Sequence, residues 1–225
     1  MVRSGFFTAT AGKFPADPTM PTKVAIVDYG TGNLHSVKRN LDRMNVSSVV
    51  SSDPDAILSS DKIILPGVGH FDTAMSKLAE LNLIDPLNEA VLIRHKPILG
   101  ICLGMEVMAK RSEEGTAAGL GWFDADTVRF QISNQLRYKV PHIGWNQVNF
   151  KKQSLLMNKI PDGSEFYFVH SYYLKLADRS DILCESTYEN DYPSAVEKGN
   201  IFGVQYHPEK SHDVGAQLLR NFAEL

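Results

Sequence analysis

The stretch Pro97-Ile-Leu-Gly-Ile-Cys-Leu-Gly-Met-Glu106 decides the fold, because an apolar run typical of a strand breaks at glycines and continues with helical spacing. A strand that turns sharply into a helix is a building unit of parallel α/β sheets. Cys102 occupies the turn. A side chain on such an elbow projects from the carboxyl end of the strand, where the following helix's free amides and dipole favour a thiolate. The stretch therefore predicts a parallel sheet with a nucleophile at its edge.

The rest of the chain alternates in the same way. Short apolar runs predict strands over 24–28, 46–51, 62–65, 97–101 and 201–206, and helical spacing predicts helices over 34–44, 71–81, 103–110 and 214–222. Aromatics, valines and turn residues with few helical periods predict antiparallel strands within 122–150 and 164–188. We therefore expect an α/β domain over 23–225, with a mostly parallel sheet flanked by helices and an added antiparallel region.

Residues 1–22 differ in composition from the domain that follows. They carry Arg3 and Lys13, several hydroxyl side chains and one acidic residue, Asp17. That composition is typical of a transit peptide, but prolines at 15, 18 and 21 spoil an amphipathic helix. We favour a disordered N-terminal extension or an upstream start, with Met20 as an alternative initiator.

Composition narrows the classes of function. The 23 basic and 26 acidic residues are mixed along the chain, so no basic stripe is available for nucleic acid. No apolar run approaches the roughly 18 residues of a membrane span. The two cysteines, Cys102 and Cys184, are far apart and form neither a disulfide framework nor a metal-ligand pattern, which favours a reducing compartment, the cytoplasm or an organelle interior.

Neither a cofactor nor a metal is expected. Gly30-Thr-Gly-Asn33 lacks the third glycine of a dinucleotide fingerprint, since His35 stands in its place. His142 and His170 have no cysteine, histidine and acid cluster with metal-ligand spacing around them, so a structural role is favoured for both.

Phe202-Gly-Val-Gln-Tyr-His-Pro-Glu209 supplies two further parts of a catalytic triad. In extended backbone His207 and Glu209 point to the same side, with Pro208 fixing the local φ between them. A neutral histidine can take the proton of Cys102, and an acid can orient that histidine and stabilise its charged form. A surface His-Pro-Glu turn beside a buried structural cysteine is the alternative.

A third element favours the catalytic interpretation. Pro66-Gly-Val-Gly-His70 follows a predicted strand, and Gly67, Val68 and Gly69 form a loop flexible enough to aim backbone amides at an oxyanion. Together the elbow, the loop and the histidine-acid pair predict covalent acyl transfer.

These motifs match a family. Gly100-Ile-Cys-Leu-Gly104 resembles the nucleophile motif of class I glutamine amidotransferases, and His207-Pro-Glu209 resembles their base and orienting acid. From about Lys23 to the end, the chain is similar to glutaminase subunits of imidazole glycerol phosphate synthases. The motifs that carry this similarity are Asp28-Tyr-Gly-Thr-Gly-Asn-Leu34, Pro66-Gly-Val-Gly-His-Phe71, Pro141-His-Ile-Gly-Trp-Asn146, Tyr167-Phe-Val-His-Ser-Tyr-Tyr173 and His207-Pro-Glu-Lys-Ser211.

The resemblance implies glutamine hydrolysis with transfer of ammonia to a cyclase subunit, which makes imidazole glycerol phosphate and an aminoimidazole carboxamide ribotide in histidine biosynthesis. It implies that Cys102 attacks glutamine, His207 moves the proton and Glu209 orients His207. The amides of Leu103 and of the Val68-Gly69 loop would hold the oxyanion. Glutamine-binding positions map onto Glu106, Ser171 and Tyr172, and positions that face the partner map onto Asn33, Trp145 and Lys210.

Glu106 departs from the family pattern, which has glutamine there. An ionised carboxylate only accepts hydrogen bonds, and its charge repels the substrate's own carboxylate. Either Glu106 points elsewhere, or the substrate's amino group meets it, or glutamine affinity suffers.

Other functions stay open at this stage. Paralogous glutaminase subunits supply synthases that build amidine groups on surface sugars, and Glu106 leaves room for that assignment. A non-catalytic scaffold would keep the fold without needing the triad. A cysteine hydrolase of another substrate class is a third alternative, since the triad alone does not name the acyl group.

Overall fold

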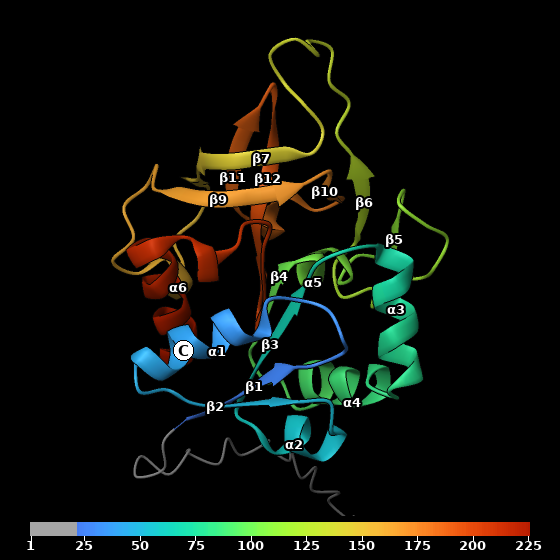
Figure 1. Cartoon of the computed structure of the whole chain (residues 1–225), viewed down its shortest axis with the longest axis vertical. Coiled ribbons are helices and arrows are strands. Elements are labelled where there is room, and N and C mark those ends of the chain that lie inside the picture. Colours follow the sequence, from blue (N-terminus) through green and yellow to red (C-terminus); the bar gives the residue numbers. More distant parts are fainter. Residues whose placement is uncertain (1–21) are drawn as a thin grey trace, which may run out of the picture.

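The computed structural model describes residues 22–225 and is built around one eight-stranded sheet (Figure 1). The predicted extension over 1–22 lies outside the described residues, apart from residue 22 itself. The strand order is β2-β1-β3-β4-β13-β12-β11-β8. The first five strands pair in parallel and the last three pair antiparallel. Their bounds are β2 (Ser47–Ser51), β1 (Lys23–Val27), β3 (Lys62–Gly67), β4 (Ile98–Cys102), β13 (Ile201–Val204), β12 (Asn190–Lys198), β11 (Ile182–Tyr188) and β8 (Asn149–Phe150).

Helices cover both faces of the parallel strands, because successive strand residues point to opposite sides and the central strands β1, β3 and β4 carry buried apolar residues on both. Val24 and Ile26 belong to one core cluster with α1 (Leu34–Arg43) and α6 (His212–Glu224). Ala25 and Val27 belong to the other, with α2, α3 and α4. The bounds of these last three are α2 (Pro54–Ser59), α3 (Phe71–Glu80) and α4 (Ile84–Asn88), and a π-helical turn (Glu89–Ile93) follows α4. The mostly parallel sheet flanked by helices is confirmed.

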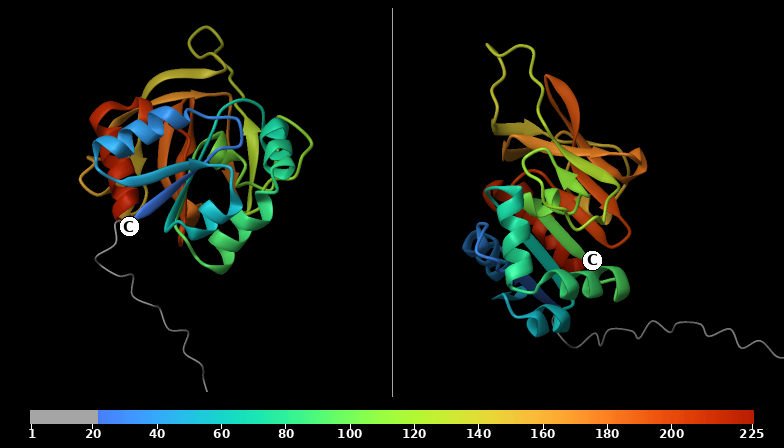
Figure 2. Two further views of the ribbon diagram at one scale, coloured as in Figure 1. Left: turned by 60° about the horizontal axis from the view of Figure 1, so that its bottom comes forward. Right: turned by 90° about the vertical axis from the view of Figure 1, so that its right-hand side faces the viewer.

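The predicted antiparallel region forms a second layer beyond the carboxyl ends of the parallel strands (Figures 1 and 2). It holds the antiparallel pair β7 (His142–Gln147) and β9 (Glu165–His170) and a three-stranded sheet. In that sheet β10 (Tyr172–Leu176) pairs antiparallel with β6 (Ala125–Arg129), while the two-residue strand β5 (Arg111–Ser112) pairs with β6 in parallel. This layer roofs the sheet edge at which a parallel α/β fold places its ligands.

The predicted helix over 103–110 is wrong beyond residue 106. Helix α5 covers only Leu103–Glu106. The carbonyls of residues 107–110 accept hydrogen bonds from the amides of residues 119–123, which lie outside the helix. The amides of residues 108 and 109 donate to carbonyls only three residues back, and the Lys110 amide donates to the Ala125 carbonyl in β6, so the helical pattern stops and the helix ends after one turn.

A membrane-spanning helix must be both long and apolar. Within residues 22–225, none combines the length and the apolar character that a span requires.

The sharp turn after β4 depends on small residues. A Cβ atom built on Gly104 would lie 1.7 Å from the carbonyl oxygen of Leu65 in β3. One built on Gly100 would lie 2.6 Å from the Met108 methyl group. The helix that follows Cys102 can therefore pack directly against the neighbouring strand only because position 104 carries no side chain.

We predict that Gly104→Ala destabilises the protein by about 3 kcal/mol, because backbone rather than a flexible side chain occupies the space that the methyl group needs. Urea unfolding followed by circular dichroism measures the change. Glu80→Ala on the exposed end of α3 is the control, with an expected change within about 0.5 kcal/mol. Equal midpoints for Gly104→Ala and the control would contradict this account of the turn.

Candidate active site

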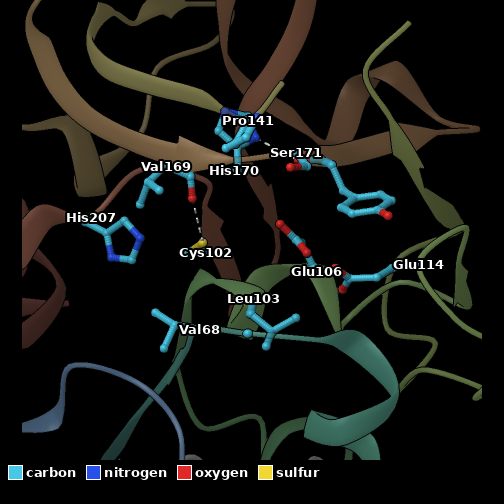
Figure 3. A pocket seen from close by; sticks show the side chains of 12 residues that line it. Val68, Cys102, Leu103, Glu106, Glu114, Pro141, Val169, His170, Ser171 and His207 are labelled. Atoms are coloured by element: carbon cyan, nitrogen blue, oxygen red, sulfur yellow. Dashed lines mark hydrogen bonds between the residues drawn. The ribbon is translucent and has the colours of Figure 1, made fainter. Parts of the chain in front are cut away.

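Cys102 ends β4 in a conformation that is unusual for a residue with a side chain, at φ 54° and ψ −114°. Such backbone strain is common at functional sites. Its side chain is 7% exposed and borders a cavity of about 350 Å³ (Figure 3). The thiol lies 3.9 Å from the carbonyl oxygen of Val169, and Nε2 of Gln205 lies 4.0 Å from the sulphur. The predicted elbow and its position at a strand end are confirmed.

The expectation that the helix favours a Cys102 thiolate needs correction. Burial raises the pKa of the thiol well above its usual range, and the nearby carboxyl group of Glu106 raises it further. The backbone amide of Leu103 acts in the opposite direction, but it belongs to a helix of only four residues. The resting nucleophile is therefore a thiol, and it needs a base.

His207 supplies a base that faces the same cavity (Figure 3). Its Nδ1 lies 2.8 Å from Oε1 of Glu209, and both side chains are 1% exposed. A neutral imidazole that donates from Nδ1 has Nε2 free to accept a proton, and Nε2 has no hydrogen-bond partner among residues 22–225. The predicted extended backbone is wrong, because Pro208–Lys210 forms a 3-10 turn, yet the turn still brings the two side chains together.

The glycine loop lies beside the elbow in register. Gly67 ends β3 opposite Cys102, and Gly69 adopts a left-handed φ of 105°. The Val68 amide donates to Oγ1 of Thr31 at 3.1 Å, and the Thr31 hydroxyl is also hydrogen-bonded to the Val68 carbonyl. The loop is thus placed as predicted, but Thr31 already occupies one of its amides.

Glu106 faces the cavity instead of pointing elsewhere (Figure 3). It is 5% exposed, and its Oε1 accepts a hydrogen bond of 2.7 Å from Nε2 of Gln205. Burial raises the pKa of its carboxyl group to about 8; the Gln205 bond acts against that rise and the charge of Glu114 adds to it. At neutral pH this carboxyl group is largely uncharged.

Ser171, after β9, and Tyr172, at the start of β10, line the same cavity. Glu114, which was not predicted from sequence, lines the same cavity, and its Oε2 accepts a hydrogen bond of 2.7 Å from the Phe71 amide. It lies in a loop with no motif to mark it. Gln205 was also missed, although it stands two residues before His207 in a stretch already singled out.

Two of the three residues expected to face a partner come together. Trp145 is 44% exposed and stacks on His212 at a ring distance of 5.1 Å. It also meets Tyr167 edge to face at 6.0 Å, and Nζ of Lys210 lies 5.7 Å from the centre of the Tyr167 ring. Asn33 lies directly before α1. Trp145 is therefore a surface residue rather than a core aromatic.

His142 and His170 form a buried pair at the cavity roof. His170 lines the cavity, donates from Nδ1 to the Tyr172 carbonyl at 2.7 Å, and holds Nε2 3.2 Å from Nδ1 of His142. Burial lowers the pKa of His142 to about 4 and that of His170 to about 3. No group of three potential metal ligands occurs within residues 22–225. The pair is a neutral support for the segment that carries Ser171 and Tyr172.

Known proteins resemble the chain over nearly its whole length. The family described as "Glutamine amidotransferase class-I" matches residues 25–225. Imidazole glycerol phosphate synthase subunit HisH 2 of Methanococcus maripaludis is 48% identical, over 88% of this chain and 98% of that protein. The subunit of the same name from Pseudomonas aeruginosa is 45% identical, over 90% and 99%. A solved glutamine amidotransferase, 17% identical, shares the fold with a TM-score of 0.65, over 89% and 97% of the two chains.

The buried histidine pair predicts a loss of stability in acid. Unfolded histidines bind protons below about pH 6.5, whereas the folded pair binds them only near pH 3 to 4, so the free energy of unfolding falls as pH falls through this window. Each histidine contributes roughly 1 kcal/mol per pH unit. Urea titrations between pH 7 and pH 4 measure this slope, and His142→Phe should make it shallower. Equal slopes for the two proteins would show that the pair does not carry the effect.

Proposed function

The chain belongs to the class I glutamine amidotransferase family, and we propose that it is the glutaminase subunit of an imidazole glycerol phosphate synthase in histidine biosynthesis. One observation supports glutamine hydrolysis as the chemistry of this family member. A thiol, an imidazole oriented by a buried carboxylate, and a glycine loop converge on one cavity beneath the antiparallel layer. The high identity to two subunits of that name supports the assignment to this synthase.

The proposed first step forms the bond between the Cys102 sulphur and the side-chain amide carbon of glutamine. The thiol proton passes to Nε2 of His207, because Nδ1 is engaged by Glu209. Glu209 holds this tautomer and stabilises the imidazolium that forms. Since burial disfavours the thiolate, proton transfer and attack on the carbon are coupled.

Collapse of the tetrahedral intermediate breaks the bond between carbon and nitrogen. The leaving nitrogen takes the proton from His207 and departs as ammonia, which leaves a glutamyl thioester on Cys102. Water, deprotonated by the same imidazole, then attacks the thioester and releases glutamate with regeneration of the thiol. One glutamine and one water become one glutamate and one ammonia.

Backbone amides stabilise the oxyanion in this proposal. The Leu103 amide lies beside the sulphur, and the loop from Gly67 to Gly69 supplies the second donor. Because the Val68 amide is hydrogen-bonded to Thr31, the loop must rearrange before that amide can serve. We therefore expect the isolated chain to have low activity.

The cavity contains groups that suit an amino acid. Glu114 is a carboxylate placed to meet the α-amino group of glutamine, and Ser171 and Tyr172 line the same cavity. A neutral Glu106 can donate as well as accept a hydrogen bond, as an amide does, so it need not repel the substrate carboxylate.

The proposed partner is a cyclase subunit, and the pair forms a heterodimer in the cytoplasm. Ammonia released into water is protonated and lost as a nucleophile, so the glutaminase gains from docking to the enzyme that consumes it. The surface around Trp145 and Lys210, together with Asn33, is the proposed docking face. Both cysteines are free thiols, which fits a reducing compartment.

A paralogous amidotransferase is the second candidate, and Glu106 is the observation that favours it. Such a chain would release glutamate from glutamine by the same steps but would dock to a different cyclase-like partner. Complementation of a strain that lacks the histidine-pathway glutaminase discriminates between the two. Growth without histidine supports the first assignment, and failure with an active protein supports the second.

We predict that purified chain releases glutamate slowly from glutamine and is stimulated strongly by a histidine-pathway cyclase with its nucleotide substrate. Cys102→Ala should abolish release under every condition. A coupled glutamate assay, run with each component omitted in turn, measures the effect. Release that ignores the cyclase would point to another partner, and no release under any condition would revive the non-catalytic scaffold.

We further predict that Thr31→Val raises glutamate release by the isolated chain about tenfold or more, because it frees the Val68 amide without changing the side chain's size. One oxyanion donor is worth roughly 100-fold or more in rate. Thr31→Ser keeps the hydroxyl and serves as the matched control. Equal rates for the valine and serine variants would mean that Thr31 does not restrain the loop.

A further inference from the structure

Glu106, Gln205 and Cys102 form a continuous polar contact within the cavity wall. Gln205 is fully buried, and its Nε2 lies 2.7 Å from Oε1 of Glu106 and 4.0 Å from the sulphur of Cys102. A side-chain amide nitrogen carries two hydrogens, so one can serve each neighbour. The remaining Gln205 oxygen has no hydrogen-bond partner among residues 22–225. One amide thus joins the nucleophile to a carboxyl group that the triad does not use.

The contact places two groups that cannot easily both be negative side by side. Cys102 and Glu106 are 7% and 5% exposed, so water screens little of their mutual repulsion. A carboxylate at position 106 opposes the thiolate, whereas a neutral carboxyl group does not. The protonation of Glu106 therefore bears directly on the reactivity of the sulphur.

We propose that Glu106 controls the nucleophile: Cys102 ionises more readily while the Glu106 carboxyl group is neutral than after that group has lost its proton. This assigns Glu106 a positioning and tuning role toward Cys102, separate from any contact with substrate. Any consequence of this control for glutamine turnover rests on the proposed glutaminase function. The influence of the Glu106 charge on ionisation of Cys102 does not depend on that function.

Few other charges face Glu106. Tyr29, after β1, is a buried phenol whose pKa is raised, so it stays neutral. His170, at the end of β9, is neutral because burial lowers its pKa to about 3. His207 borders the cavity and is paired with Glu209, and Lys210 follows them on the same turn.

Glu114, after β5, is the carboxylate that acts on Glu106 most directly, and it raises the Glu106 pKa. The Gln205 hydrogen bond lowers that pKa. These two neighbours therefore shift the Glu106 pKa in opposite directions, so the proposal can be tested with two independent substitutions. With the Glu106 pKa at about 8, the change of charge falls in an accessible pH range.

The test is alkylation of Cys102 by iodoacetamide, without glutamine, from pH 6.5 to pH 9.5. The sulphur forms a bond to carbon, iodide leaves, and the thiol proton passes to His207 or water. The reagent is neutral, so Glu106 does not repel it. Intact-mass spectrometry gives the rate, and Cys102→Ala gives the background, which includes the fully buried Cys184.

We expect Glu106→Gln and wild type to react at similar rates at pH 6.5, where both side chains are neutral. At pH 9.5 the variant should react about threefold faster. Loss of one adjacent negative charge makes the thiolate fraction about tenfold larger, and the lower nucleophilicity of the less basic thiolate removes part of that gain. The ratio of the two rates should rise through about pH 8.

Two further variants move that rise in opposite directions. Glu114→Gln removes the charge that raises the Glu106 pKa, so the rise should shift to lower pH. Gln205→Met removes the hydrogen bond that lowers it, so the rise should shift to higher pH. Each shift is measured against the same substitution combined with Glu106→Gln. A purely structural disturbance would not produce two opposite displacements.

A rate ratio that is constant with pH, or shifts of the same sign in Glu114→Gln and Gln205→Met, would overturn the proposal. Circular dichroism of each variant excludes unfolding as the cause. Glutamate release is measured separately. If the ratio of alkylation rates depends on pH but no glutamate is released, the glutaminase function is refuted and the control of Cys102 by Glu106 stands. If glutamate is released but the ratio is constant with pH, the glutaminase function stands and the control of Cys102 is refuted.

Discussion

The contact between the turn after β4 and the end of β3 is the constraint on which the site depends. Gly104 packs against the carbonyl of Leu65, and Cys102 pairs in register with Gly67. This packing sets the nucleophile beside the glycine loop, where Cys102 adopts a positive φ of 54°. The same contact therefore supports the sheet, aims the sulphur and brings an oxyanion donor next to it.

Burial dominates the electrostatics of the cavity. It raises the pKa of Cys102 and Glu106 and lowers that of His142 and His170, so the resting site holds few charges apart from Glu114 and the acid that orients His207. Neutral groups are cheaper to keep in such a site than charged ones. Reactivity then depends on moving a proton at the right moment, from the sulphur to His207, instead of on a preformed thiolate.

Local sequence predicted most of the fold because each element carries its own pattern. The alternation of short apolar runs and helical spacing placed the parallel strands and the helices α1, α3 and α6. It failed for the helix expected over 103–110, since the Lys110 amide that would have continued it donates instead to the distant Ala125 carbonyl. The short helices α2 and α4 had too few periods to be recognised.

The sequence by itself determined which residues could do the chemistry, because an elbow cysteine, a glycine loop and a histidine with a nearby acid are marked by their spacing. Only the tertiary structure decided how those residues behave. It buries Cys102 next to Glu106 and brings Glu114 and Gln205 close to them from other segments. It also pairs the Val68 amide with the Thr31 hydroxyl in a hydrogen bond. Protonation and hydrogen-bond partners depend on neighbours that are distant in sequence, and no local pattern records those neighbours.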